Sequence, residues 1–227
     1  MATVVTYNGV RAPSLTDLDA RKYAVYFDDF VADLGNDTVT AATAGTGAHT
    51  NDGTADGGMY RINAASATDG QGPNIQFKNF SVTPAAGKSI YFECGLKFID
   101  EAAVDLFIGL SSINTTIMIT DDVDPDSVGF VSFEDSSIDA VTRDDASELV
   151  TKTLDVGTVT LNSLTKFAIA IDGLSKISYY INDALVATST TNVPAGSMVP
   201  SIVLHACSGS TAQPEIYLDY LFAAVER

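Results

Sequence analysis

Apolar and polar residues alternate along five segments of the chain. A period of two predicts β-strands that bury one face in a core and turn the other face outward. The longest example is 89–99, in which every second side chain from Ile90 to Phe98 is apolar. In the last segment, Ile216, Leu218, Tyr220 and Phe222 are predicted to share the buried face. The five segments are 74–80, 89–99, 166–172, 177–182 and 215–222.

Shorter apolar runs between turn signals predict further strands. Asp172-Gly173 and Asn182-Asp183 predict tight turns, because Gly, Asn and Asp tolerate the left-handed backbone that such turns require. Many short strands separated by turns predict a sandwich or barrel. We therefore expect an all-β fold, a two-sheet antiparallel jelly-roll β-sandwich, formed by 1–227 as a single domain. The further strands are predicted at 23–27, 59–62, 104–112, 128–133, 184–190 and 199–206.

Two stretches lack the alternating pattern. Residues 35–58 are rich in Gly, Thr and Ala and predict a long surface loop, of the length that usually carries function or stays disordered. Residues 1–22 are predicted to form an N-terminal arm. Within it, Ser14 and Asp17 stand at the spacing of a helix capping box, which predicts one short helix over 14–22.

The charge balance narrows the classes of partner. There are 29 acidic and 12 basic residues, a net charge of −17. Such a field repels nucleic-acid phosphates and anionic lipid headgroups, so we expect neither nucleic acid nor membrane as a partner. The chain has no run of 18 apolar residues, so the sequence predicts no membrane span. The N-terminus also lacks a secretory signal pattern, which favours folding in the cytoplasm.

The cysteines and histidines predict no zinc site. Cys94 and Cys207 lie in apolar runs and are expected to be buried free thiols. A disulfide between them stays open, because it depends on a Cα separation that the sequence does not provide. His49 and His205 show no ligand spacing, and we expect His205 to be a hydrogen-bonded strand residue.

Calcium is the one metal for which the sequence offers candidate ligands. Asp122, Asp124 and Asp126 alternate as they do at the start of an EF-hand loop. However, Ser127 replaces the glycine at position six and Phe133 replaces the glutamate at position twelve, so the EF-hand match fails. Calcium in this loop and a solvated acidic turn both remain open.

No catalytic centre is recognisable. Glycosidases need two carboxylates across one cleft, no more than about 9.5 Å apart. The nearest pair on one strand is Glu215 and Asp219, which would lie about 13 Å apart in extended backbone. There is no G-x-S-x-G nucleophile motif, phosphate loop or dinucleotide fingerprint. We therefore expect a protein that is not an enzyme and uses no cofactor.

The order of segments from 89 onward resembles the concanavalin A-like, or laminin G-like, jelly roll. The resemblance is carried by SIYFECGLKFI, VDLFIGLSS, DSVGFVSF, KFAIAIDGLSKISYYINDALVAT and EIYLDYLFAAVER. It implies the fold and leaves the function open, because this fold hosts both lectins and glucanases.

The chain also resembles virion proteins of tailed bacteriophages that use this fold. The features are YFDDF at 26–30 before a Gly/Thr/Ala-rich loop, an unprocessed start, and an acidic, lysine-poor composition. This resemblance implies a non-enzymatic decoration or cement protein on the capsid exterior, made in the host cytoplasm. It would bind the major capsid protein or other virion proteins, as a homo-oligomer or in many copies. The alternative is a glycan-binding, lectin-like module of a phage tail or fibre, or a secreted carbohydrate-binding protein.

Overall fold

The structure is a computed structural model that describes most of the chain. The described residues are 5–7, 10–12, 22–30, 39–44, 48–52, 58–64, 67–100, 103–113, 116–119, 122–144, 149–208 and 213–227; in β1, β2, β4 and β5 they are described by their backbone.

The described residues contain nineteen β-strands and no helix. Their bounds are β1 Val5–Tyr7, β2 Val10–Ala12, β3 Tyr23–Asp28, β4 Val39–Ala44, β5 Ala48–Asp52, β6 Met59–Asn63, β7 Gly72–Phe77, β8 Ser89–Phe98, β9 Val104–Ser111, β10 Met118–Ile119, β11 Asp122–Val123, β12 Ser127–Asp135, β13 Ser137–Asp144, β14 Leu149–Thr158, β15 Leu164–Asp172, β16 Lys176–Ile181, β17 Ala184–Ser189, β18 Val199–His205 and β19 Glu215–Glu226.

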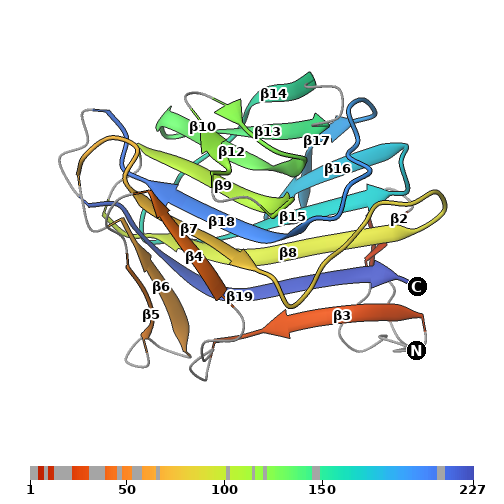
Figure 1. The fold of residues 1–227 in the computed structure, drawn as a ribbon, viewed down its shortest axis with the longest axis horizontal. Helices are drawn as coiled ribbons and strands as arrows, with labels where there is room; N and C mark the ends of the chain where they lie inside the picture. Colours follow the sequence, from red (N-terminus) through yellow and green to blue (C-terminus); the bar gives the residue numbers. More distant parts are fainter. Residues whose placement is uncertain are drawn as a thin grey trace.

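Two large antiparallel sheets form the molecule. Sheet I has seven strands in the order β14-β13-β12-β9-β18-β7-β4, and sheet II has the order β17-β16-β15-β8-β19-β6-β5 with β3 also paired to β19. In Figure 1, sheet I runs from β14 at the top to β4 at the lower left, and β3 lies along the bottom. The expected all-β, two-sheet architecture is confirmed.

The core lies between the two sheets. Alternate side chains of β8, including Phe92 and Phe98, point inward from sheet II and are fully buried. They meet inward side chains of sheet I such as Phe130, whose ring packs edge-on against Phe167 and Tyr179 at centroid distances of 5.2 and 5.5 Å. The buried face predicted for 89–99 is thus confirmed.

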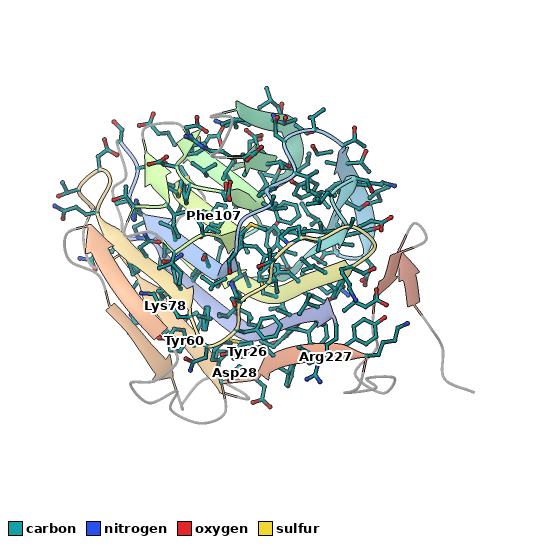
Figure 2. The ribbon with its side chains drawn as sticks, turned by 45° about the vertical axis from the view of Figure 1, so that its right-hand side comes forward. Tyr26, Asp28, Tyr60, Lys78, Phe107 and Arg227 are labelled. Atoms are coloured by element: carbon teal, nitrogen blue, oxygen red, sulfur yellow. The ribbon has the colours of Figure 1, made fainter. Side chains whose placement is uncertain are left out.

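Aromatic residues close the base of the sandwich near β3. Tyr60 stacks on Phe30 at 5.2 Å, and Tyr26 lies 6.3 Å from Phe77 across to sheet I. Figure 2 shows Tyr26, Asp28 and Tyr60 gathered in this region. The Tyr26 hydroxyl donates to Asp28. These contacts fasten β3, which only β19 pairs among the described strands, to the common core.

The predicted turns have the expected backbone. Gly173 has a φ of 60° in the β15–β16 turn, and Asn182 and Asp183 have φ of 49° and 67° in the β16–β17 turn. Both hairpins keep adjacent strands in register. Gly, Asn and Asp occupy these positions because other residues strain in the left-handed region.

The predicted buried face of the last strand is half wrong. Ile216 and Leu218 point into the core as expected, but a β-bulge at Asp219 shifts the register between Leu218 and Tyr220. An extra residue in one strand exchanges the two faces beyond it. Tyr220 and Phe222 therefore lie on the outward face, and the core receives Leu221, Ala223 and Val225.

The loop predicted at 35–58 contains two strands. β4 pairs with β7 at one edge of sheet I, and β5 pairs with β6 at one edge of sheet II. β-ladder hydrogen bonds use the backbone, so small residues do not prevent pairing. β13 and β14 were not predicted at all. The helix expected over 14–22 falls on positions that, except residue 22, lie outside the described residues.

Both cysteines are buried free thiols, as expected. Burial raises the pKa of the Cys94 thiol well above its ordinary value, which keeps it protonated. In the described part of the chain, no helix is long and apolar enough to cross a membrane.

The aromatic contacts of Phe130 predict its importance for stability. We expect Phe130→Ala to lower the free energy of unfolding by about 3–5 kcal/mol, because it leaves a cavity between the sheets. Leu154→Ala is the control, since Leu154 is 66% exposed. Urea unfolding of both variants checks this, and similar losses for both would contradict the role assigned to Phe130.

Candidate functional site

The outward face of sheet II is mainly apolar. Tyr91, Tyr180 and Phe222 form a separate cluster there with neighbouring alanines, each no more than 5% exposed. The backbone of β2 lies against β8 and β15 on this sheet. Next to the cluster, Glu93 accepts hydrogen bonds from the hydroxyls of Tyr91 and Tyr220. The Glu93 carboxylate is thus engaged by the tyrosine hydroxyls beside it.

The outward face of sheet I contains a row with little side-chain volume. Gly129, Gly109, Ser201 and Gln76 lie opposite one another on β12, β9, β18 and β7. A Cβ atom on Gly129 would lie 2.7 Å from the ring of Phe107, so glycine is needed for this ring to pack. The row therefore forms a floor made mostly of backbone.

Amide and hydroxyl groups gather at one end of this row. The Gln76 amide donates to the Oγ atoms of Ser111 and Ser201, at 3.2 Å each, and to the backbone oxygen of Ser112 at 3.1 Å. The two serine oxygens are 2.8 Å apart. All three side chains are at most 3% exposed. Satisfying buried polar groups in this way fixes their orientation.

Ser127 Oγ and His205 Nε2, on the same face, make no hydrogen bond with the described residues. Ser127 lies on the strand next to Ser111, and His205 lies at the far end of β18. Both side chains are more than nine-tenths buried. Buried polar groups in folded proteins nearly always have a partner, so these two atoms have binding capacity that the chain's described contacts do not use.

The segment between β9 and β12 covers part of this face. Its backbone closes through a hydrogen bond from Ser112 N–H to the oxygen of Asp126, at 2.8 Å, and through the short β10–β11 pair. Its apolar side chains pack on outward residues of four sheet I strands; Phe107, one of these, is labelled in the upper half of Figure 2. The covering residues are Ile117, Met118 and Val123, and the covered ones are Phe107, Val131, Val141 and Val203.

The acidic candidates for calcium lie on this covering segment. Asp124 is 3.2 Å from Arg143, and Asp122 is 3.7 Å from Lys152 and 3.9 Å from Arg143. These cations neutralise much of the charge that would attract a metal ion. Among the described residues, no group of three or more His, Cys, Asp or Glu could hold one. Calcium at Asp122, Asp124 and Asp126 stays a prediction.

Glu215 is held by neighbouring polar side chains. Glu215 is buried and accepts hydrogen bonds from Arg61 and from Asn63, the latter at 3.0 Å. Burial raises the pKa of Glu215, but the hydrogen bonds from Arg61 and Asn63 outweigh it and the pKa is lowered. Asp219 lies at the bulge of β19, which the extended-strand estimate did not include.

The sequence placed Gln76 on an outward strand face but did not identify this site. Ser111 and Ser201 belong to strands that the sequence predicts, and Ser127 lies one residue before the strand predicted at 128–133. Serine is abundant, however, and each of the three lies on a different strand. The sequence signal that could have indicated this site is the recurrence of small residues at outward strand positions. These residues become neighbours only through the order of the strands in the sheet. His205 lies in a strand, as expected. The expected hydrogen bonding is wrong for its Nε2 atom, which makes no hydrogen bond with the described residues.

Comparisons with known proteins place the fold. No family model and no curated protein matches the sequence. Among solved structures, a Bacillus licheniformis β-glucanase aligns over 88% of this chain and 97% of its own, with 10% identity and a TM-score of 0.63. An endo-β-1,4-glucuronan lyase from the fungus Trichoderma reesei aligns over 87% and 94%, with 9% identity and a TM-score of 0.58. The carbohydrate recognition domain of Emp47p aligns over 91% and 98%, with 9% identity and a TM-score of 0.60.

These structures confirm the concanavalin A-like jelly roll and correct one expectation. The prediction that the chain is not an enzyme is contradicted, because a glucanase and a lyase are among the similar structures. At this level of identity the likeness shows the fold and assigns no reaction. The location on a capsid, the virion partners and the single-domain boundary stay predictions.

His205 predicts a pH dependence of stability. Burial lowers its pKa from 6.5 to about 4, so the unfolded chain binds this proton at higher pH than the folded chain does. The free energy of unfolding should therefore fall by up to about 3 kcal/mol as the pH falls from 6.5 to 4. We expect His205→Gln to remove this part of the dependence, as measured by urea unfolding at several pH values. Parallel profiles for wild type and variant would contradict it.

Proposed function

We propose that this protein binds carbohydrate on the outward face of sheet I. The observation that carries the proposal is the unused hydrogen-bonding capacity of Ser127 near the Gln76 amide and two ordered serine hydroxyls, with that of His205 at the other end of the same face. Sugar hydroxyls both donate and accept hydrogen bonds, so they complement a surface of amide, hydroxyl and imidazole groups.

The Phe107 ring supplies an apolar element of this face. It packs over Gly129, where a Cβ atom would lie 2.7 Å from the ring. An aromatic ring offers an apolar surface to the C–H groups of a sugar, while the polar groups at the end of the row fix its orientation.

The similar structures agree with this ligand class. Their names describe a glucanase, a glucuronan lyase and a carbohydrate recognition domain. Polymers of glucose and of glucuronic acid are therefore the first ligands to test. Mass spectrometry of the same incubations would detect cleavage of the polymer as well as binding.

Access to the face requires movement of the covering segment. Met118 and Val123 are almost fully buried against sheet I, whereas Asp122 and Asp124 are partly exposed at their ion pairs. Opening must break the apolar contacts, while partly exposed ion pairs oppose it weakly. Association should accordingly be slower than for a preformed open site.

Substitution of Ser127 tests the site. Because its hydroxyl makes no hydrogen bond with the described residues, Ser127→Ala should leave the melting temperature unchanged or raise it. The same change should weaken glycan binding about fivefold, the loss of one ligand hydrogen bond of about 1 kcal/mol. A glycan array followed by titration calorimetry on the best ligand provides the measurement.

Ser178→Ala is the matched control. Ser178 is an equally buried serine on the outward face of sheet II, and its loss should leave binding unchanged. Binding that survives Ser127→Ala undiminished would show that the ligand lies elsewhere. Absence of binding to every glycan on the array would refute the proposed function.

A further inference from the structure

Arg143 extends the polar row of sheet I by one strand. It lies on β13 directly opposite Ser127, and Ser127 lies opposite Ser111 on β9. The Ser111 and Ser201 hydroxyls and the Gln76 amide continue the line through their hydrogen bonds. A residue with a permanent positive charge is thus the strand neighbour of Ser127, whose hydroxyl makes no hydrogen bond with the described residues.

Carboxylates of the covering segment engage the Arg143 guanidinium. Its Nη2 atom lies 3.2 Å from Asp124 Oδ1, and its Nη1 atom lies 3.9 Å from Asp122 Oδ2. Nη1 also donates to the backbone oxygen of Val123 at 2.6 Å, and the Arg143 side chain is only 12% exposed. The planar guanidinium presents its N–H groups at the spacing of carboxylate oxygens. The outward face of sheet I therefore has a position for a carboxylate, which aspartates of the chain itself occupy.

Movement of the covering segment changes the partners of Arg143. A ligand reaches Ser127 only when this segment moves, and Asp122 and Asp124 move with it because they belong to it. The bound ligand then covers Arg143 again, and a covered cation without an anionic partner is costly. A neutral sugar cannot supply that partner, whereas a sugar carboxylate can.

The net charge of −17 does not prevent the binding of such a ligand. At physiological salt the Debye length is about 8 Å, so distant acidic residues act weakly on a ligand at β13, while a contact ion pair is little screened. The strands of sheet I contain two Lys or Arg residues, Arg143 and Lys152, which lie on the adjacent strands β13 and β14. Lys152 lies 3.7 Å from Asp122, so both cations lose this carboxylate when the segment moves.

We propose that the ligand of this face is a glycan that contains uronic acid, and that Arg143 and the Ser127 hydroxyl bind its carboxylate in place of Asp122 and Asp124. The guanidinium supplies the charge, and the serine hydroxyl donates to a carboxylate oxygen. Arg143 is then the residue that selects acidic over neutral sugars. This inference rests on the proposed carbohydrate binding and adds the class of sugar to it.

A glycan array of matched pairs tests the class of sugar. Each oligosaccharide of glucuronic, galacturonic, mannuronic or guluronic acid is placed beside its carboxyl-reduced form, which has the same linkage and no charge. Sulfated neutral glycans are included because sulfate is also anionic, and the buffer contains no divalent cation. We expect at least one uronate to bind about tenfold more tightly than its reduced form, the contribution of one charge-assisted hydrogen bond.

Two substitutions should shift uronate binding in opposite directions. Arg143→Gln should weaken it about tenfold, because the ligand carboxylate loses its guanidinium partner. Asp124→Asn should strengthen it about threefold, because the competing carboxylate is removed from a partly exposed ion pair. A purely structural role of this ion pair would weaken binding in both variants. Titration calorimetry with the best uronate measures the affinities, and melting temperatures report folding.

Arg61→Gln is the matched control. Arg61 also pairs with a carboxylate, that of Glu215, but on sheet II, so its substitution should leave uronate binding unchanged. If Arg143→Gln does not fold, Asp124→Asn and the matched array decide the inference.

Equal binding of uronates and their reduced forms would overturn the inference and leave the proposed carbohydrate binding standing. So would preferential binding of sulfated glycans, or an Asp124→Asn variant that binds uronate no better than wild type. Absence of binding to every glycan would overturn both proposals.

Discussion

The fold depends on the packing of the inward faces of sheets I and II against each other. Phe92 and Phe98 from β8 meet Phe130 and its neighbours from β12, and these side chains are fully buried. Because side chains alternate along a strand, fixing the inward residues also fixes which residues point outward. The outward faces, where binding would occur, are thus set by the core.

The two outward faces have different chemistry for this reason. On sheet II, Tyr91 and Phe222 add apolar surface, and Glu93 is engaged with tyrosine hydroxyls. On sheet I, glycines and small polar residues form the central row, beside an apolar region that the segment between β9 and β12 covers. The polar row on sheet I combines buried hydrogen-bonding groups with little side-chain volume.

Much of the strand pattern could be predicted from the sequence, and the failures have physical causes. Alternation identifies a strand when one face is apolar and the other polar. On β13 the outward Val141 is itself buried under the covering segment, so the contrast is lost and the strand was missed. At Asp219 the bulge exchanged the faces of β19, which no periodic pattern predicts.

The sequence by itself determined the all-β class, the central hairpin turns and the burial of Cys94 and Cys207. These follow from local periodicity, backbone preference and hydrophobicity. Tertiary structure alone decided that Gln76, Ser111, Ser127 and Ser201 form one face, because they come from four strands whose neighbours are set by sheet order. It also decided that β17 is the end strand of sheet II. Contacts between distant segments depend on how the sheets assemble, which local sequence does not specify.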